Sequence, residues 1–460
     1  MLWLAHQQLK SKSTRIRRQA VEKLGRGMAS AVIPVFIRVL REDPEPEVRE
    51  AAALALSDHR EQEVLDALIA ALTDPAAEVR SAAVDGLRRV GDSSAIPALA
   101  PLLKAADVGL RSRVAQALKM LAWQPEEPDQ EADFLVALGD LSRAAILGKA
   151  AVGALAKVLE DSAYQRRVVA VNRLAEIGDP SAIPPLITAL RDTESVVRTA
   201  AANALGRLGA LVAGPRLVHL LRDADANVRA ASAEAVGLLK EQRALSNLIK
   251  LLQDPHWEAR SAALEALGRL GDPEALIPMC AVLQDRDREV REQAALALGS
   301  LRDPRAAAPL VVAMLDPERV VRHAAARVLQ QLDPYWERLP AVQEVLGQVR
   351  QALQHPDYGV RQVAAEILRR CGERTPSESE AAGATGTTWC RRKTGVELLL
   401  DLLADPDPAL RQAALECLDR RPDWVPPVDR LNLLKDDPDD SIRRLARAIA
   451  GRPALEGSEL

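Results

Sequence analysis

The sequence has 460 residues, a net charge of −4, 48% hydrophobic residues and only 2% aromatic residues. This composition suits a core of Ala, Leu and Val, and the nearly balanced charge disfavours a protein whose main task is to hold nucleic acid. The first residues lack the pattern of a secretory signal, and no run of about 18 apolar residues is free of charges. The four cysteines have neither CxxC pairing nor metal-ligand spacing. We therefore expect free thiols, no membrane segment and a cytoplasmic location.

An arginine recurs along the chain at a fixed step of 31 residues. It stands at positions 167, 198, 229, 260, 291 and 322, and with the same step at 49, 80 and 111. Looser copies at 17, 361, 411 and 443 bring the total to about 13 units. Most copies follow the pattern Asp-x5-Arg and then Ala-Ala-x-x-Leu-Gly, as in Asp192 to Gly209. A fixed period of this length indicates a solenoid of stacked repeats.

The rhythm of the repeat divides the chain into segments. We predict a block of about four units over 1–120, an insertion over 121–160, six regular units over 161–332, an offset unit over 333–371, a mobile loop over 372–392 and further units over 393–460. The insertion contains helical patterns, so we expect packed structure that bends the stack, with a binding element as the alternative. The loop is rich in Ser, Gly, Thr and Ala and has no apolar period.

Each regular unit predicts two helices and no strand. In the unit of Arg198, Asp179-Pro180 opens a helix A over 181–190, and Pro184 should bend or loosen its first turn. In helix B, one stripe of apolar residues follows the helical period. Its members are Val197, Ala201, Leu205 and Leu208. Neither helix can bury its stripe alone, so the pairs must stack.

These patterns resemble a known family. The Asp-Pro-x-Ala-Ile-Pro-x-Leu helix, the Asp-x4-Val-Arg turn and the Ala-Ala-x-x-Leu-Gly helix are similar to HEAT repeats, most of all to the bacterial phycobilisome-lyase HEAT-like type. The resemblance implies an all-α, armadillo-like superhelix of about 13 helix pairs. The function that we favour is a monomeric, non-enzymatic scaffold that binds a protein partner through a concave helix-B surface. The alternative that the resemblance offers is a lyase-associated or chaperone role toward a bilin-carrying phycobiliprotein.

An aspartate precedes most of the recurring arginines by six residues. The pairs are Asp74 and Arg80, Asp161 and Arg167, Asp192 and Arg198, Asp223 and Arg229, Asp254 and Arg260, Asp285 and Arg291, and Asp316 and Arg322. Such an Asp can close the A–B turn, and the Arg can reach the Asp of its own or of the adjacent unit. We interpret this Asp–Arg ladder as a clamp that fixes the register of neighbouring units. The alternative is a stripe of arginines for an anionic ligand.

A second row of arginines lies nine residues after the first. It comprises the arginines at 26, 89, 207, 269, 370, 420 and 452. An acid often stands four residues earlier, which is the favoured helical ion pair and predicts a self-neutralised, solvated face. Arg207 lacks that acid, because Asn203 stands there. If nucleic acid or another polyanion binds in the inner groove, which is the second alternative function, Arg207, Arg452 and the arginines at 15, 17 and 18 are the candidates.

The sequence offers no pattern for catalysis. Related helical-repeat enzymes that bind iron carry His-Glu dipeptides, and this chain contains none. No GxSxG, P-loop or HExxH pattern occurs either, and the six histidines are scattered. We therefore predict no enzymatic activity, no catalytic residue, no metal site and no cofactor.

Aromatic residues mark the places where the repeat pattern is altered. Tyr164, Trp257 and Tyr358 replace small residues near the A–B turn of their units. Three tryptophans lie at interruptions of the repeat, namely Trp123 in the insertion, Trp336 in the second break and Trp389 beside the mobile loop. Exposed aromatic residues are favoured anchors of interfaces. These six residues and Arg207 are our candidate partner contacts, with packing as the alternative for each.

Overall fold

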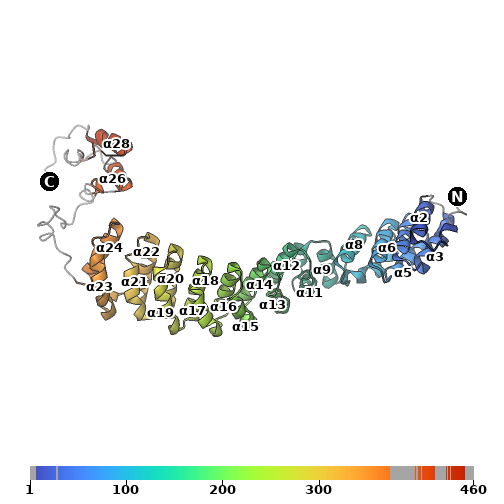
Figure 1. The fold of residues 1–460 in the computed structure, drawn as a ribbon, viewed down its shortest axis with the longest axis horizontal. Coiled ribbons are helices and arrows are strands. Elements are labelled where there is room, and N and C mark those ends of the chain that lie inside the picture. Colours follow the sequence, from blue (N-terminus) through green and yellow to red (C-terminus); the bar gives the residue numbers. More distant parts are fainter. Residues whose placement is uncertain are drawn as a thin grey trace. The chain divides into compact units, whose positions relative to one another are not determined.

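The computed structural model describes residues 7–26, 30–372, 399, 402–405, 407–419, 431, 434–435 and 437–450. Within these residues the chain is helical and has no strand, which confirms the predicted all-α class (Figure 1). The chain divides into two compact units, Met1–Ala364 and Ala365–Leu460. Residues 373–392, most of the predicted mobile loop, and Trp389 lie outside the described residues.

Helix A and helix B alternate through the first unit. The A helices are α3 (Ile33–Glu42), α5 (Gln62–Ala71), α7 (Ile96–Leu99), α9 (Pro128–Ala137), α11 (Val152–Val158), α13 (Ile183–Ala189), α15 (Gly214–Leu220), α17 (Leu245–Leu251), α19 (Leu276–Ala281), α21 (Ala307–Ala313) and α23 (Pro340–Ala352). The B helices are α2 (Thr14–Gly25), α4 (Pro46–Leu56), α6 (Ala77–Val90), α8 (Val108–Met120), α10 (Leu141–Ile146), α12 (Tyr164–Ile177), α14 (Ser195–Arg207), α16 (Ala226–Leu238), α18 (Trp257–Leu270), α20 (Arg288–Leu301) and α22 (Arg319–Leu332), and α24 (Tyr358–Arg370) crosses the boundary between the units.

The helix pairs stack in chain order. Most B helices pack on the helix B of the next pair, so α12 contacts α14, α14 contacts α16, and α16 contacts α18 (Figure 1). Most B helices also pack on their own helix A, as α14 does on α13 and α16 on α15. The apolar stripe predicted for α14 lies in this core, where Val197, Ala201 and Leu205 are fully buried. The core therefore lies between the two layers of helices, and its buried residues from Val21 to Leu118 form one connected cluster.

Most A helices begin with a short 3-10 turn. These turns are η1 (Ser30–Val32), η2 (Ser93–Ala95), η5 (Pro180–Ala182), η6 (Leu211–Ala213), η7 (Gln242–Ala244), η8 (Pro273–Ala275) and η10 (Pro304–Ala306). The carboxylate of Asp179 caps η5 by accepting the backbone N–H of Ser181 at 2.8 Å. Pro184 then lies in the first turn of α13, where its missing N–H costs no hydrogen bond. The predicted bend is thus a 3-10 turn joined to a short α-helix.

Residues 121–160 are helical throughout most of their length. Helices α9 and α10 pack on each other, α9 contacts α8, and α10 contacts α12. The 3-10 turn η4 (Gly148–Ala151) and α11 then form helix A of the unit of Arg167. The insertion therefore contributes a shortened helix pair to the stack. Three further 3-10 turns complete the unit: η3 (Ala100–Lys104), η9 (Val282–Gln284) and η11 (Trp336–Arg338).

Small residues let the B helices approach closely. Gly206, Gly237, Gly268 and Gly299 recur at the 31-residue step near the ends of α14, α16, α18 and α20. A Cβ atom on Gly206 would lie 2.8 Å from Cα of Ala235, and one on Gly237 would lie 2.7 Å from Cα of Ala266. These separations are shorter than ordinary carbon contacts, so glycine is required for this crossing distance.

The second unit has its own small core. Its described helices include α26 (Pro408–Asp419) and α28 (Asp440–Ala450), which pack on each other. Leu415, Leu418, Ile442 and Ile449 are buried in this core. An arginine links two consecutive turns in this unit as well, since Nε of Arg411 donates to the carboxylate of Asp437 at 2.7 Å.

Candidate functional site

An aspartate closes the turn between helix A and helix B. Its carboxylate accepts the backbone N–H of the residue two positions later. Oδ1 of Asp192 accepts the N–H of Glu194, and Oδ1 of Asp254 accepts the N–H of His256, each at an N–O distance of 2.9 Å. Asp223 accepts the N–H of Asp225 in the same way. The short side chain thus holds the turn that leads into helix B, as an Asx turn does.

In most units the recurring arginine joins two consecutive turns. Nη1 of Arg198 donates to the backbone carbonyl of Asp192 in its own unit at 2.9 Å. Nε and Nη2 of the same guanidinium donate to the carboxylate of Asp223 in the next unit, at 2.9 and 2.8 Å. Of the two partners the sequence allowed, the adjacent carboxylate is therefore the one that is bonded. The same bidentate contact joins Arg17 to Asp43, Arg49 to Asp74, Arg167 to Asp192, Arg229 to Asp254, Arg260 to Asp285, Arg291 to Asp316 and Arg411 to Asp437.

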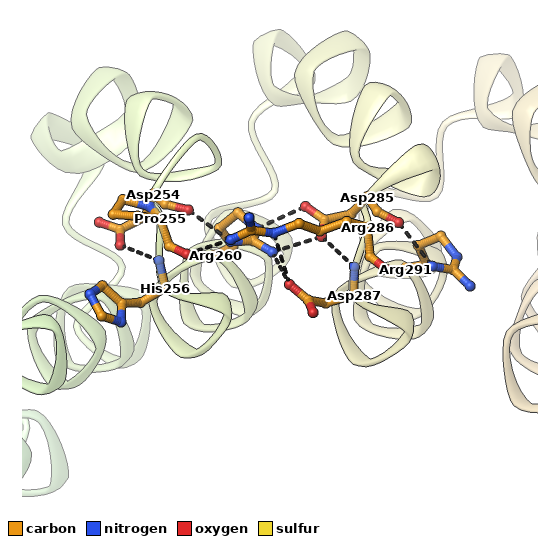
Figure 2. A network of polar contacts seen from close by, with 8 residues as sticks. All are labelled: Asp254, Pro255, His256, Arg260, Asp285, Arg286, Asp287 and Arg291. Carbon is orange, nitrogen blue, oxygen red and sulfur yellow. Dashed lines mark hydrogen bonds and ion pairs between the residues drawn. The ribbon is translucent and has the colours of Figure 1, made fainter.

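Arg260 bonds two carboxylates of the next turn. The side chain is 3% exposed, and its Nη2 donates to Asp285 at 2.7 Å and to Asp287 at 2.6 Å (Figure 2). Its Nη1 donates to the carbonyl of Asp254 at 2.8 Å. Arg286 adds a second link between the same turns by donating to the carbonyl of Pro255 at 2.7 Å. This planar fork suits two oxygens at once, a geometry that lysine cannot provide.

The ladder is interrupted after Arg80, Arg111, Arg322 and Arg361, which have no carboxylate partner in a following unit among the described residues. Arg80 and Arg322 were assigned to it, yet among the described residues neither pairs with a carboxylate, and each donates only to backbone carbonyls of its own turn. The position that should supply the acceptor holds Ala105 after Arg80 and His355 after Arg322. Asp161, which follows the interruption after Arg111, forms an ion pair with Nε of Arg166 at 3.1 Å, and no arginine of an earlier unit pairs with it among the described residues.

Completing the first gap should stabilise the protein. In an Ala105→Asp variant, the new carboxylate can accept Nε and Nη2 of Arg80 and the backbone N–H of Asp107, as Asp74 does from Arg49 and Ala76. We expect a gain of about 1 kcal/mol in the free energy of unfolding, measured by urea denaturation. The double variant with Arg80→Met is the control, since it should lose this gain. An equal effect in both variants would contradict the pairing.

The ladder also perturbs its carboxyl groups. Burial alone would raise the pKa of Asp223. The Arg198 guanidinium and the backbone N–H of Asp225 together lower this pKa by more than burial raises it, so it lies below its ordinary value. The pKa values of Asp192 and Asp254 are lowered by the same balance of burial, guanidinium and backbone N–H. The ionised form of these groups is therefore favoured by folding.

This shift predicts how stability depends on pH. The folded pKa lies below the unfolded value of about 3.9, so the contribution is complete above that value and is lost as the pH falls through the folded pKa. We expect a level urea midpoint from about pH 7 to about pH 5 and a decline below about pH 4. An Asp223→Asn variant should be less stable at neutral pH and should decline less on acidification. An unchanged slope in that variant would contradict a role of the ladder in acid unfolding.

The second arginine row is neutralised only in part, and mostly not by the predicted partners. Glu265 and Arg269 form the expected pair at 2.6 Å. Asp85, however, pairs with Arg88 at 3.3 Å and with Arg113 of the next unit, whereas the prediction paired it with Arg89. Similarly, the acids at 22 and 366 pair with the arginines at 18 and 369 and not with those at 26 and 370. These acids pair instead with an arginine three residues later, with one four residues earlier, or with one on the neighbouring helix B. Arg207 has no carboxylate partner among the described residues.

Two tryptophans of the interruptions, Trp123 and Trp336, contribute to packing. Trp336 is 2% exposed, so it is removed from the candidate partner contacts: η11 folds its ring into the interior. Trp123 is half-buried and meets Phe134 of α9 edge-on, with ring centroids 5.5 Å apart. Both residues lie where the chain changes its register, and their rings fill the space that the irregular turn opens.

The remaining aromatic candidates lie at one position of the repeat. Tyr164, Trp257 and Tyr358 are the first residues of α12, α18 and α24. Tyr164 is 40% and Trp257 is 44% exposed, whereas Tyr358 is half-buried beneath the guanidinium of Arg361, 5.5 Å from the ring centroid. Tyr164 and Trp257 are therefore available to a partner.

The described residues contain no group of three or more His, Cys, Asp or Glu placed to hold a metal ion. None of the described helices combines the length and the apolar character that crossing a membrane requires. Burial, with a smaller contribution from Asp303, raises the pKa of the Cys280 thiol to about 11, so this thiol is protonated and unreactive at neutral pH.

Helix pairs that are closed by an Asp turn and clamped by an arginine to the next pair define an α-α repeat solenoid. The chain belongs to the HEAT repeat family: a family model of HEAT repeats matches residues 4–88, 65–156, 152–237, 214–285, 274–330 and 349–450. The resemblance predicted from the sequence is thereby confirmed.

The comparisons also found similar individual proteins. An uncharacterized phycocyanin operon protein Z of Pseudanabaena tenuis is 30% identical over 149 residues, which is 32% of this chain and 64% of that protein. The chain thus spans less than two thirds of the length of this relative. Among solved structures, an engineered protein matches 81% of this chain and 99% of its own, with 20% identity and a TM-score of 0.29. The Escherichia coli protein YibA matches 64% of this chain and 98% of its own, with 18% identity and a TM-score of 0.31.

Proposed function

We propose that this chain is a non-catalytic scaffold that binds a protein partner across the first turns of its B helices. The observation that carries this proposal is a row of exposed apolar side chains at that position. The first-turn row comprises Val108, Tyr164, Val196, Trp257 and Val320, each two or three residues before the arginine of its unit.

Recurrence at one place in the fold supports a binding role for this row. Single exposed apolar residues are common on any surface, but a set that repeats on parallel helices can contact one partner together. Trp257 and Tyr164 are the residues most suited to anchor such a contact, because aromatic side chains dominate interface energetics. The ladder fixes the spacing of α12 to α22, which carry all members of the row except Val108, so this part of the row has a defined geometry before a partner binds.

The test is affinity capture with quantitative mass spectrometry. A Tyr164→Ala, Trp257→Ala variant should recover its specific partner at least about tenfold less than the unmodified chain. Tyr335→Ala is the control, because Tyr335 is an aromatic residue that is more exposed than Tyr164 and Trp257 but lies between α22 and α23, outside the first-turn row. Unchanged recovery by the double variant, or equal loss in the control, would contradict the proposal.

A phycobiliprotein is the second candidate partner, favoured by the likeness to a phycocyanin operon protein. In this form the scaffold would assist a bilin-carrying protein, as a chaperone or beside a lyase. Surface plasmon resonance with purified phycocyanin, with and without its bilin, tests it. Micromolar or tighter binding that Trp257→Ala weakens would support this partner, and no binding at micromolar concentration would exclude it without affecting the scaffold proposal.

A further inference from the structure

A groove on the helix-A layer is lined by cationic side chains. It lies between α13 and α15, has a volume of about 590 Å³, and is lined by Leu190, Arg191, Pro215, Arg216, His219 and Leu220. No acidic residue lines it, and neither α13 nor α15 contains an Asp or Glu. Leu190 and Leu220 are buried and form its apolar floor.

The next repeat shows what this groove lacks. One step of 31 residues takes Arg191 to Arg222 and Arg216 to Asn247. There, Nε and Nη2 of Arg222 donate to Oδ1 of Asn247 at 3.2 and 2.8 Å, so the amide satisfies the guanidinium. In the groove between α13 and α15, the position of that acceptor is occupied by a second guanidinium.

Two guanidiniums therefore face one groove with no acceptor between them. Among the described residues, neither Arg191 nor Arg216 has a hydrogen-bond or ion-pair partner through its side chain. The arginines of the ladder, by contrast, are mostly bonded to carboxylates. Two like charges side by side repel each other unless an anion lies between them, and arginine forks match the two oxygens of a carboxylate or phosphate.

We propose that this groove binds a small organic anion. Its carboxylate or phosphate group lies between Arg191 and Arg216, His219 offers a further donor, and the apolar part of the ligand covers Leu190, Pro215 and Leu220. The volume of the groove is within the range of small-molecule sites. Such sites also combine apolar side chains with a few convergent polar groups, as this groove does. This site belongs to the A helices, so it is independent of the partner surface proposed for the B helices.

Isothermal titration calorimetry with phenyl phosphate and with inorganic phosphate tests the proposal. Phenyl phosphate should bind the full chain and should bind more tightly than inorganic phosphate, because only the former covers the apolar floor. Arg216→Asn should weaken the binding of phenyl phosphate by at least about tenfold, the effect of removing one charge-assisted contact. Arg243→Asn is the control, since Arg243 is exposed in η7, outside the groove, and this variant should bind like the unmodified chain.

The Arg216→Asn variant also reports on its own folding. The new amide reproduces the pair of Arg222 and Asn247, so its melting temperature without ligand should equal or exceed that of the unmodified chain. Loss of binding with the fold retained would support the site. Absence of binding to the unmodified chain, or equal binding by the variant, would overturn the proposal. Binding of a tetraglutamate peptide without binding of phenyl phosphate would overturn it in favour of an acidic protein segment.

Discussion

Replacement of Arg260 by alanine should lower the free energy of unfolding by about 3 kcal/mol. The guanidinium is buried and bonds the carboxylates of Asp285 and Asp287 and the carbonyl of Asp254. Its removal leaves the half-buried carboxylate of Asp285 without its cation and breaks a link between two units. Urea denaturation measures the total loss, and hydrogen exchange of α18 and α20 locates it, because solenoids do not always unfold in one step.

Arg80→Ala is the matched control for this experiment. Arg80 occupies the same position of its unit and donates to the carbonyls of Asp74 and Pro75, but it has no carboxylate partner among the described residues. We expect a loss of about 1 kcal/mol for this variant. Equal losses for both variants would show that the backbone bonds, and not the carboxylates, stabilise the ladder.

Replacement of Gly237 by alanine should destabilise the protein by about 2 kcal/mol, although alanine is the better helix former by about 1 kcal/mol. The added Cβ would lie 2.7 Å from Cα of Ala266 on the next helix B. A backbone atom cannot move aside as a flexible side chain can, so α16 and α18 must separate. Thermal and urea denaturation both measure this cost.

Gly153→Ala provides the opposite case. Gly153 lies within α11, and a Cβ atom there would have no neighbour within 4 Å. We expect this variant to gain about 0.5–1 kcal/mol from the lower conformational freedom of its unfolded state. If Gly237→Ala were stabilising as well, the close crossing of α16 and α18 would not require glycine.

The sequence predicted the helices well, because their signals are local. The period of 31 residues, the Asp-Pro starts and the apolar stripe of α14 each act within one unit, and the structure has helix pairs at these places. Asp192 was recognised as a turn residue for the same reason. Which carboxylate Arg198 bonds was left open, since the choice between Asp192 and Asp223 depends on how two units stack.

Other features depended on contacts that no local pattern records. Trp336 stands beside Tyr335 in the same break, yet the first is buried and the second exposed, a difference set by the fold of η11. The groove at Arg191 and Arg216 was not predicted either. A comparison of the repeats position by position could have found it, because Asn247 is the residue that stands one step after Arg216.

The interruptions of the ladder affect how the protein unfolds. In a stack whose units contact only their neighbours, unfolding spreads through the interfaces, and its cooperativity depends on the coupling at each one. The interfaces that follow Arg80 and Arg322 lack a carboxylate rung, whereas rungs continue without interruption from Arg167 to Asp316. The segment from the unit of Arg167 to the unit of Arg322 should therefore melt as one cooperative block, and the repeats on either side should open earlier and separately. The first boundary of this block lies at the interruption after Arg111, and the second lies after Arg322, where His355 stands at the position of the aspartate.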